Sequence, residues 1–211
     1  MQVLQFVCCC LRSFRQPLSD EDEIELSRKS GLTNSAVMCK AGLHGSNITL
    51  STDPTNNFVT VTGKGIALGS ATLDCDTGFW EIRIGTNPSD VCVGVKKFVA
   101  KKPANLDGYL DDTPIVDEDS PSWIFKGNEF KTGDVVGIFW DQTDLPMLSF
   151  SLNGNIIPEA SILRIRPAND IVPAISLKEG SSCEMIFDGS HFIHPPKSSK
   201  FQMIISAKSL L

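Results

Sequence analysis

Two histidines near the C-terminus are the first residues whose spacing could support chemistry. His191 and His194 form an H-x-x-H pair, and imidazole nitrogens are common ligands of zinc. A zinc site needs further ligands, and the metalloprotease motif has a glutamate between its histidines, where this chain has apolar residues. We therefore interpret the pair as part of a closing turn before Pro195-Pro196, and we expect no metal site there.

Other patterns that could bind phosphate or support catalysis are incomplete. Gly63-Lys64-Gly65 with Gly69 lacks the spacing and the strand-to-helix context of nucleotide-binding motifs, so we interpret these residues as turn glycines. The acidic residues of "NLDGYLDD" do not match a calcium-binding loop, and no G-x-S-x-G sequence presents a nucleophilic serine. The histidines lie outside the best-defined strands. We expect no catalytic residue and no cofactor.

Three adjacent cysteines near the N-terminus suggest a different kind of chemistry. Cys8, Cys9 and Cys10 lie in the apolar sequence "MQVLQFVCCCLRSFRQ", and thiols beside apolar and basic residues are typical of reversible S-palmitoylation. Arg12 and Arg15 would each add roughly 1 kcal/mol at an anionic leaflet. The alternatives are a frayed tail whose thiols have no role and a metal-binding cysteine cluster. We predict lipidation of the three cysteines, and hence peripheral association with a cytoplasmic membrane face.

Composition narrows the class of protein. The chain has 211 residues, of which 41% are hydrophobic and 21% charged, as in soluble globular proteins. Its net charge of −6 argues against a general nucleic-acid surface, because phosphate binding requires a basic face. The seven cysteines are odd in number and irregularly spaced, which does not indicate a disulfide framework. A reducing, cytoplasmic location is the simplest account.

Alternating apolar residues predict β-strands over most of the chain. In residues 135–141 both faces are apolar, which indicates a strand covered on two sides, and Gly137 there would allow close approach of a neighbouring backbone. Asn153-Gly154 predicts a type I′ hairpin. Helical periodicity is scarce, so an antiparallel sandwich or barrel is expected. Other strands are expected at residues 58–65, 79–86, 91–98, 148–152, 171–177 and 183–187. In two of them the alternation assigns faces: Trp80, Ile82 and Ile84 point one way and Glu81 and Arg83 the other, and Val91, Val93 and Val95 share a single face.

A long loop separates two of these strands. Residues 96–122 carry lysines first and carboxylates afterwards, with Tyr109, the one tyrosine of the sequence, between them. Long loops on a rigid scaffold often hold binding residues, and an amphipathic tyrosine is a good anchor. The alternative is a solvated insertion without a partner.

The order of the strands resembles the successive blocks of a SPRY (B30.2-like) domain. The resemblance covers residues 58–187, and "KTGDVVGIFWD" followed by an alternating strand into "NG" is its most specific part. It implies an all-β fold, a bent antiparallel two-sheet β-sandwich of the SPRY and concanavalin-like kind, preceded by a short N-terminal apolar segment. It also implies a protein-interaction module without enzyme activity. The other blocks are "FWEIRI", "DVCVGV", "GYLDD" with "SWIF", "LSFSLNGN", "IVPAISL" and "CEMIFDG".

The resemblance also implies where a partner would bind. In SPRY adaptors a tyrosine that follows glycine after the "VGV" strand helps to form a peptide pocket, and Gly108-Tyr109 is similar. The same pocket uses a Val-Trp-Gly turn before a "CEI" strand. Here that turn is Lys178-Glu179-Gly180, without the tryptophan. The candidate partner-binding residues are therefore Gly108, Tyr109, Lys178, Glu179 and Gly180.

Together these observations predict four regions and one main function. We expect a cysteine-rich anchor at residues 1–16, an acidic linker at 17–35, a SPRY β-sandwich at 36–205 and a tail at 206–211. The expected function is that of an adaptor for a protein or short peptide, with no nucleic acid and no small-molecule substrate as partner. The alternatives are a glycan-binding concanavalin-like lectin and an enzyme with an unrecognised site.

Overall fold

The computed structural model describes residues 44–97, 105–110, 122–126, 130–165 and 171–204, all within the unit Ser35–Leu211. These residues form nine strands, paired antiparallel throughout, and two 3-10 turns. The predicted all-β antiparallel fold is confirmed. In the described part of the chain, no helix has the length and hydropathy needed to cross a bilayer. The strands are β1 (Ile48–Thr52), β2 (Val59–Leu68), β3 (Thr77–Ile84), β4 (Val91–Lys97), β5 (Ser122–Phe125), β6 (Val135–Asp141), β7 (Met147–Leu152), β8 (Asn155–Leu163) and β9 (Ile171–Ile186), and the turns are η1 (Pro88–Asp90) and η2 (Gly189–His191).

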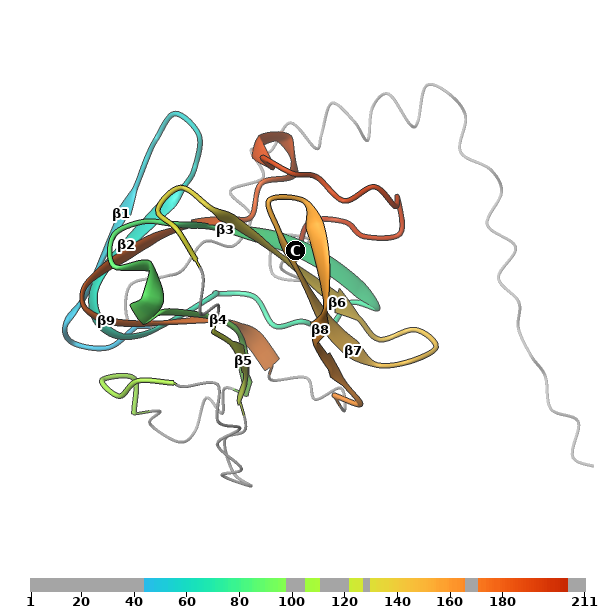
Figure 1. Cartoon of the computed structure of the whole chain (residues 1–211), viewed down its shortest axis with the longest axis horizontal. Coiled ribbons are helices and arrows are strands. Elements are labelled where there is room, and N and C mark those ends of the chain that lie inside the picture. Colours follow the sequence, from blue (N-terminus) through green and yellow to red (C-terminus); the bar gives the residue numbers. More distant parts are fainter. Residues whose placement is uncertain (1–43, 98–104, 111–121, 127–129, 166–170, 205–211) are drawn as a thin grey trace, which may run out of the picture. The chain divides into compact units, whose positions relative to one another are not determined.

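The long strand β9 joins the two layers of the fold. Its first half pairs with β4 and its second half with β3, while β2 runs along both halves. Figure 1 shows β9 bending sharply, so that its halves lie in different layers. Two separate strands were expected here, at 171–177 and 183–187. That prediction is wrong, because a bulge at residues 178–180 interrupts the pairing with β2 without ending the strand.

The glycines opposite this bulge lie inside β2. The register shift falls between Gly63 and Gly65, whose φ angles are 107° and 133°. Residues with a Cβ atom rarely adopt such φ angles. Glycine at these two positions therefore allows β2 to kink where β9 has its extra residues. The interpretation of these residues as turn glycines is therefore wrong, since they form part of a β-bulge.

The core lies between the two layers. Trp80, Ile82 and Ile84 of β3 face it from one layer, and Val91, Val93 and Val95 of β4 from the other, as their alternation predicted. A second, smaller cluster covers the opposite face of β4. It contains Ile66, Leu68, Cys92, Leu106, Leu110, Ile124, Val172 and Ala174. Residues 105–110 thus close the outer side of the β4 layer.

The central strand β6 is covered on both faces, as predicted. Ile138 and Trp140 are fully buried in the core, and on the other face the Phe139 ring packs against the Phe79 ring. Gly137 does not serve a neighbouring backbone as expected. A Cβ there would lie 2.5 Å from Ser151 Oγ and 3.0 Å from the Phe79 ring, so the glycine makes room for two side chains.

The hairpin predicted at Asn153-Gly154 joins β7 to β8. Both residues have positive φ angles, 50° and 79°, as a type I′ turn requires. The Asn153 side chain fixes the turn to β6, because its oxygen accepts a hydrogen bond from Val135 N at 2.9 Å and its amide donates to Asp134.

After β9, residues 187–204, called the strap below, run across the outer face of β3 and β6. Phe79 N donates a hydrogen bond to Gln202 O at 2.8 Å. The Phe192 ring packs edge-on against Phe79, and Phe201 packs against Phe139. The turn predicted around His191 is present as η2 at the start of the strap.

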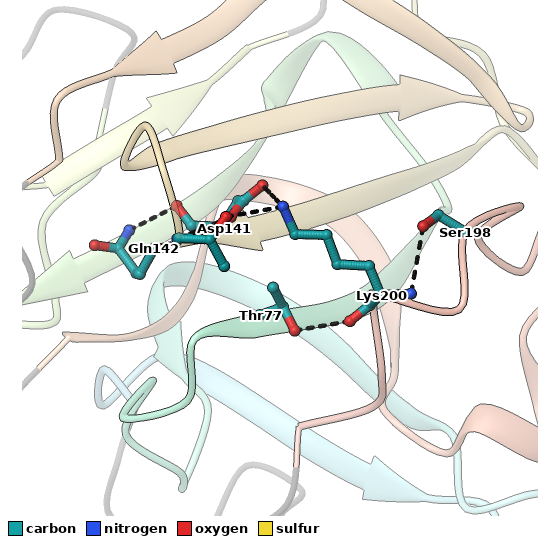
Figure 2. Close-up of polar contacts among 6 residues, drawn as sticks. Thr77, Asp141, Gln142, Ser198 and Lys200 are labelled. Carbon is teal, nitrogen blue, oxygen red and sulfur yellow. Dashed lines mark hydrogen bonds and ion pairs between the residues drawn. The ribbon is translucent and has the colours of Figure 1, made fainter.

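Polar contacts hold the strap to the sheet. Figure 2 shows Lys200 Nζ reaching the Asp141 carboxylate, at 2.7 Å, while the Thr77 hydroxyl donates to Lys200 O at 2.8 Å. Glu81 lies on the face of β3 away from the core, as its alternation predicted, yet it is fully buried beneath the strap. Its carboxylate accepts hydrogen bonds from Ile193 N and His194 N at 2.6 and 2.8 Å.

Candidate functional site

Three segments that are distant in the sequence meet at one end of the sandwich. They are the turn before β4 with η1, the segment 105–110, and the bulge 178–180 in β9. Lys178 links all three, because its Nζ lies 4.8 Å from the centroid of the Tyr109 ring and 3.4 Å from Asp90 Oδ1. An ammonium group at this distance from an aromatic face makes a cation–π contact.

The bulge itself is fixed by the turn before β4. Gly180 has a φ angle of 81°, and its carbonyl accepts a hydrogen bond from the Thr86 hydroxyl at 2.8 Å. Thr86 N donates a hydrogen bond, at 2.9 Å, to Oγ of Ser182, which lies two residues after Gly180 in β9. A Cβ at Gly180 would lie 2.8 Å from the Asn87 amide nitrogen. Glycine is therefore favoured here by the positive φ angle, since the nearby Asn87 atom is the end of a side chain that can move aside.

The segment carrying Tyr109 is anchored on both sides of the tyrosine. Leu106 O accepts a hydrogen bond from Ile66 N at 2.8 Å, and Leu110 N donates to the buried Ser176 hydroxyl at 2.8 Å. Asp107 accepts hydrogen bonds from the backbone and hydroxyl of Ser46, which hold the pKa of its carboxyl below the ordinary value. These hydrogen bonds fix the backbone on both sides of Tyr109, so its position is already set in the folded chain.

The orientation of Tyr109 determines what it can offer to a partner. Its hydroxyl lies 3.0 Å from the Sγ atom of the buried Cys92, so the polar end of the ring points into the domain. The Lys178 ammonium lies over the ring, and the Lys178 side chain is 46% exposed. The surface presented here therefore combines an aromatic ring with an ammonium group that also pairs with Asp90, and tyrosine is among the residues enriched in binding hot spots.

The predicted partner-binding residues thus fall in two neighbouring segments. Tyr109 and Lys178 are in contact, and Glu179 and Gly180 belong to the same exposed bulge as Lys178. Gly108 is exposed, and a Cβ built on it would meet no atom within 4 Å, so packing does not require glycine at this position. Cys8, Cys9 and Cys10 lie outside the described residues.

The sequence did not reveal the residues that hold this surface together. Asp90, Thr86 and Asn87 were missed, although Asn87-Pro88 is a turn signal that marked the segment. The loop was also expected to start at Lys96, but β4 continues through Lys97. Lys96 is buried in that strand.

The arrangement is suited to binding. The three histidines lie elsewhere, His44 bridging to Ala67 and the other two on the strap. No group of three or more metal-ligating side chains gathers within the described ranges. What the surface supplies is a positioned ammonium group, an aromatic ring and exposed backbone.

Comparison with known proteins identifies the fold. No family model and no curated protein sequence match the chain. Among solved structures, the PSpry domain of TRIM65 superimposes with a TM-score of 0.51 at 13% identity, covering 78% of this chain and 99% of that domain. The SPRY domain of human HERC1 gives 0.45 at 16% identity, over 66% and 94% of the two chains. Another human SPRY domain gives 0.44 at 16% identity, over 67% and 97%. The TRIM65 match, together with the bent antiparallel sandwich described above, shows that this chain has the fold of a SPRY domain.

Proposed function

We propose that the chain is a non-catalytic interaction module that binds a protein or short peptide through the surface formed by Tyr109 and Lys178. The contact between these two residues carries the proposal, because a separate hydrogen bond between a hydroxyl group and the backbone fixes each of the two segments. A prearranged ring and ammonium group lose little conformational entropy when a partner binds. The SPRY fold supports the proposal, since the resemblance of the sequence to SPRY adaptors implies the same kind of function.

The partner-binding role can be tested by quantitative affinity purification of the full chain. We expect a specific partner to be recovered at least about tenfold less with the double variant Tyr109→Ala/Lys178→Ala, because removing hot-spot residues commonly costs 2 kcal/mol or more. The control is Lys131→Ala/Leu145→Ala, which alters an exposed lysine and an exposed apolar residue outside this surface. Equal recovery with both double variants, at matched thermal stability, would reject the proposal.

We further propose that acylation of Cys8, Cys9 and Cys10 holds the module at a cytoplasmic membrane face. The support is the sequence alone: three adjacent thiols among apolar residues, followed by Arg12 and Arg15. From the same cysteine-rich start and the "HPP" sequence at 194–196, we also propose that the whole chain is similar to SPRY domain-containing protein 7. We propose that this similarity includes the cysteine-rich start as well as the fold.

Acyl-exchange labelling in cells measures this modification directly. We expect label on the natural chain and none when the three cysteines are replaced by serine, because a hydroxyl forms no thioester. Membrane fractionation should change in parallel, since two acyl chains anchor a protein that one holds only loosely. Cys75→Ser, at an exposed thiol of the sandwich, is the matched control and should keep the label. An unlabelled natural chain would refute the anchor.

A further inference from the structure

A groove lies on the outer face of β6, β7 and β8, beside the strap. Its volume is about 520 Å³, within the range of sites that hold ligands of moderate size. Phe139, Ser149 and Ser151 line it from the sheet, and residues 194–198 and Phe201 line it from the strap. Ile156 of β8 borders it and is 54% exposed. The lining is mostly apolar, with a few hydroxyl and amide groups.

The groove is held open by contacts already present in the free chain. The small serine side chains on β7 leave space above the sheet, and the restricted backbone of Pro195-Pro196 forms a rigid wall of the groove. Glu81 fixes the strap just before the prolines, and Lys200 fixes it just after them, through Asp141 (Figure 2). A groove prearranged in this way requires little ordering when it is filled.

The charges around the groove favour an acidic partner. Asp141 is the one carboxylate among the described lining residues. Burial opposes its ionisation, but hydrogen bonds from Lys200 and Thr143 outweigh that effect and hold its pKa below the ordinary value. With Asp141 balanced by Lys200, the exposed Lys197 leaves an excess of positive charge at the rim, on a chain whose net charge is −6.

We propose that this groove is a second docking surface, for an extended peptide segment of a partner protein with a large apolar side chain next to a carboxylate. The apolar side chain fills the space against Phe139 and Phe201, and the carboxylate pairs with Lys197. The hydroxyl and amide groups of Ser149, Asn155 and Ser198 are placed to hydrogen-bond the peptide backbone. These polar groups favour a peptide over a purely apolar chain, which would cover them without satisfying them.

The test uses the full chain and an array of short synthetic peptides, each with one Leu, Phe or Trp flanked by aspartate, asparagine or lysine. We expect the aspartate-flanked peptides to bind tightest. Lys197→Glu should weaken them by about fivefold or more, since an exposed ion pair is replaced by a repulsion. Ile156→Asp should weaken them too, because its charge lies at the apolar border.

Two control proteins separate this site from the one proposed above. Lys131→Glu reverses an exposed charge outside the groove and should leave peptide binding unchanged. The double variant Tyr109→Ala/Lys178→Ala should also bind these peptides normally. The inference is wrong if no peptide binds, if aspartate and lysine flanks bind equally, or if Lys197→Glu has no effect. It is also wrong if the double variant loses the peptides, which would assign them to the Tyr109–Lys178 surface.

Discussion

Replacing Gly63 by alanine should lower the free energy of unfolding by about 3–5 kcal/mol, among the largest effects that a single methyl group can have. The φ angle of Gly63 is 107°, which costs an L-residue about 1–2 kcal/mol. A Cβ there would in addition collide with the carbonyl oxygen of Asn47, on the backbone just before β1. Because the backbone of two paired strands must move to relieve this overlap, the loss should exceed the conformational penalty alone.

Gly133→Ala is the matched control for this substitution. Gly133 also has a positive φ, 93°, but a Cβ there would meet no atom within 4 Å. It should therefore lose only the conformational part, about 1–2 kcal/mol. Chemical denaturation of the two variants measures the difference. Similar losses at both positions would show that the close approach of β1 and β2 at the bulge is not a constraint on the fold.

The Gly63 variant should also weaken partner binding in the molecules that remain folded. The bulge in β2 lies opposite residues 178–180, so a shift in β2 moves the segment that carries Lys178. The proposed interaction surface and the bend of the sandwich thus depend on the same bulge.

Replacing Glu81 by glutamine should cost about 2–3 kcal/mol, although the two side chains have nearly the same shape. Both carboxylate oxygens accept backbone hydrogen bonds, one from Ile193 and one from His194. A glutamine offers one acceptor, and its NH₂ group would face a second N–H donor in a buried site. Thermal denaturation should show the loss. Glu159→Gln, on an exposed position of β8, should be neutral and serves as control. A neutral Glu81→Gln would contradict the assigned role of Glu81 in holding the strap.

The natural protein and its Glu81→Gln variant should also differ in how their stability depends on pH. Burial raises the pKa of Glu81 above its ordinary 4.5, against the opposing effect of the two hydrogen bonds and of His194. Between 4.5 and the raised pKa, the folded state holds a proton that the unfolded state has lost, so stability falls as pH rises through this window. The advantage of the natural protein over Glu81→Gln should therefore be largest below this window and decrease toward neutral pH. Other carboxylates contribute equally to both proteins and cancel.

Much of the frame could be predicted because it follows local rules. Alternation placed Trp80, Ile82 and Ile84 toward the core, and Asn153-Gly154 specified its hairpin. The order of the strands was sufficient to predict the fold that the structural comparison supports. Tyr109 and Lys178 were identified through the family resemblance, and the structure places them in contact.

What could not be predicted depends on contacts between distant segments. The sequence pattern places Glu81 as an ordinary charged residue on the outer face of its strand. Only the strap, more than a hundred residues later, buries its carboxylate and donates hydrogen bonds to it. Gly63 and Gly65 suggest a turn until the extra residues of β9 lie opposite them. Asp90 shows no signal of its own, because its role comes from the lysine in β9 that reaches it. Local patterns specify strands and turns, but they do not specify which strands meet.

Hydrogen exchange of the full chain with and without a purified partner tests most directly the proposal that partners bind where Tyr109 meets Lys178. On binding, exchange should slow at residues 86–91, 105–110 and 177–182 and stay unchanged in the interior strands. Protection confined to other surfaces, with these three segments exchanging as in the free chain, would contradict it.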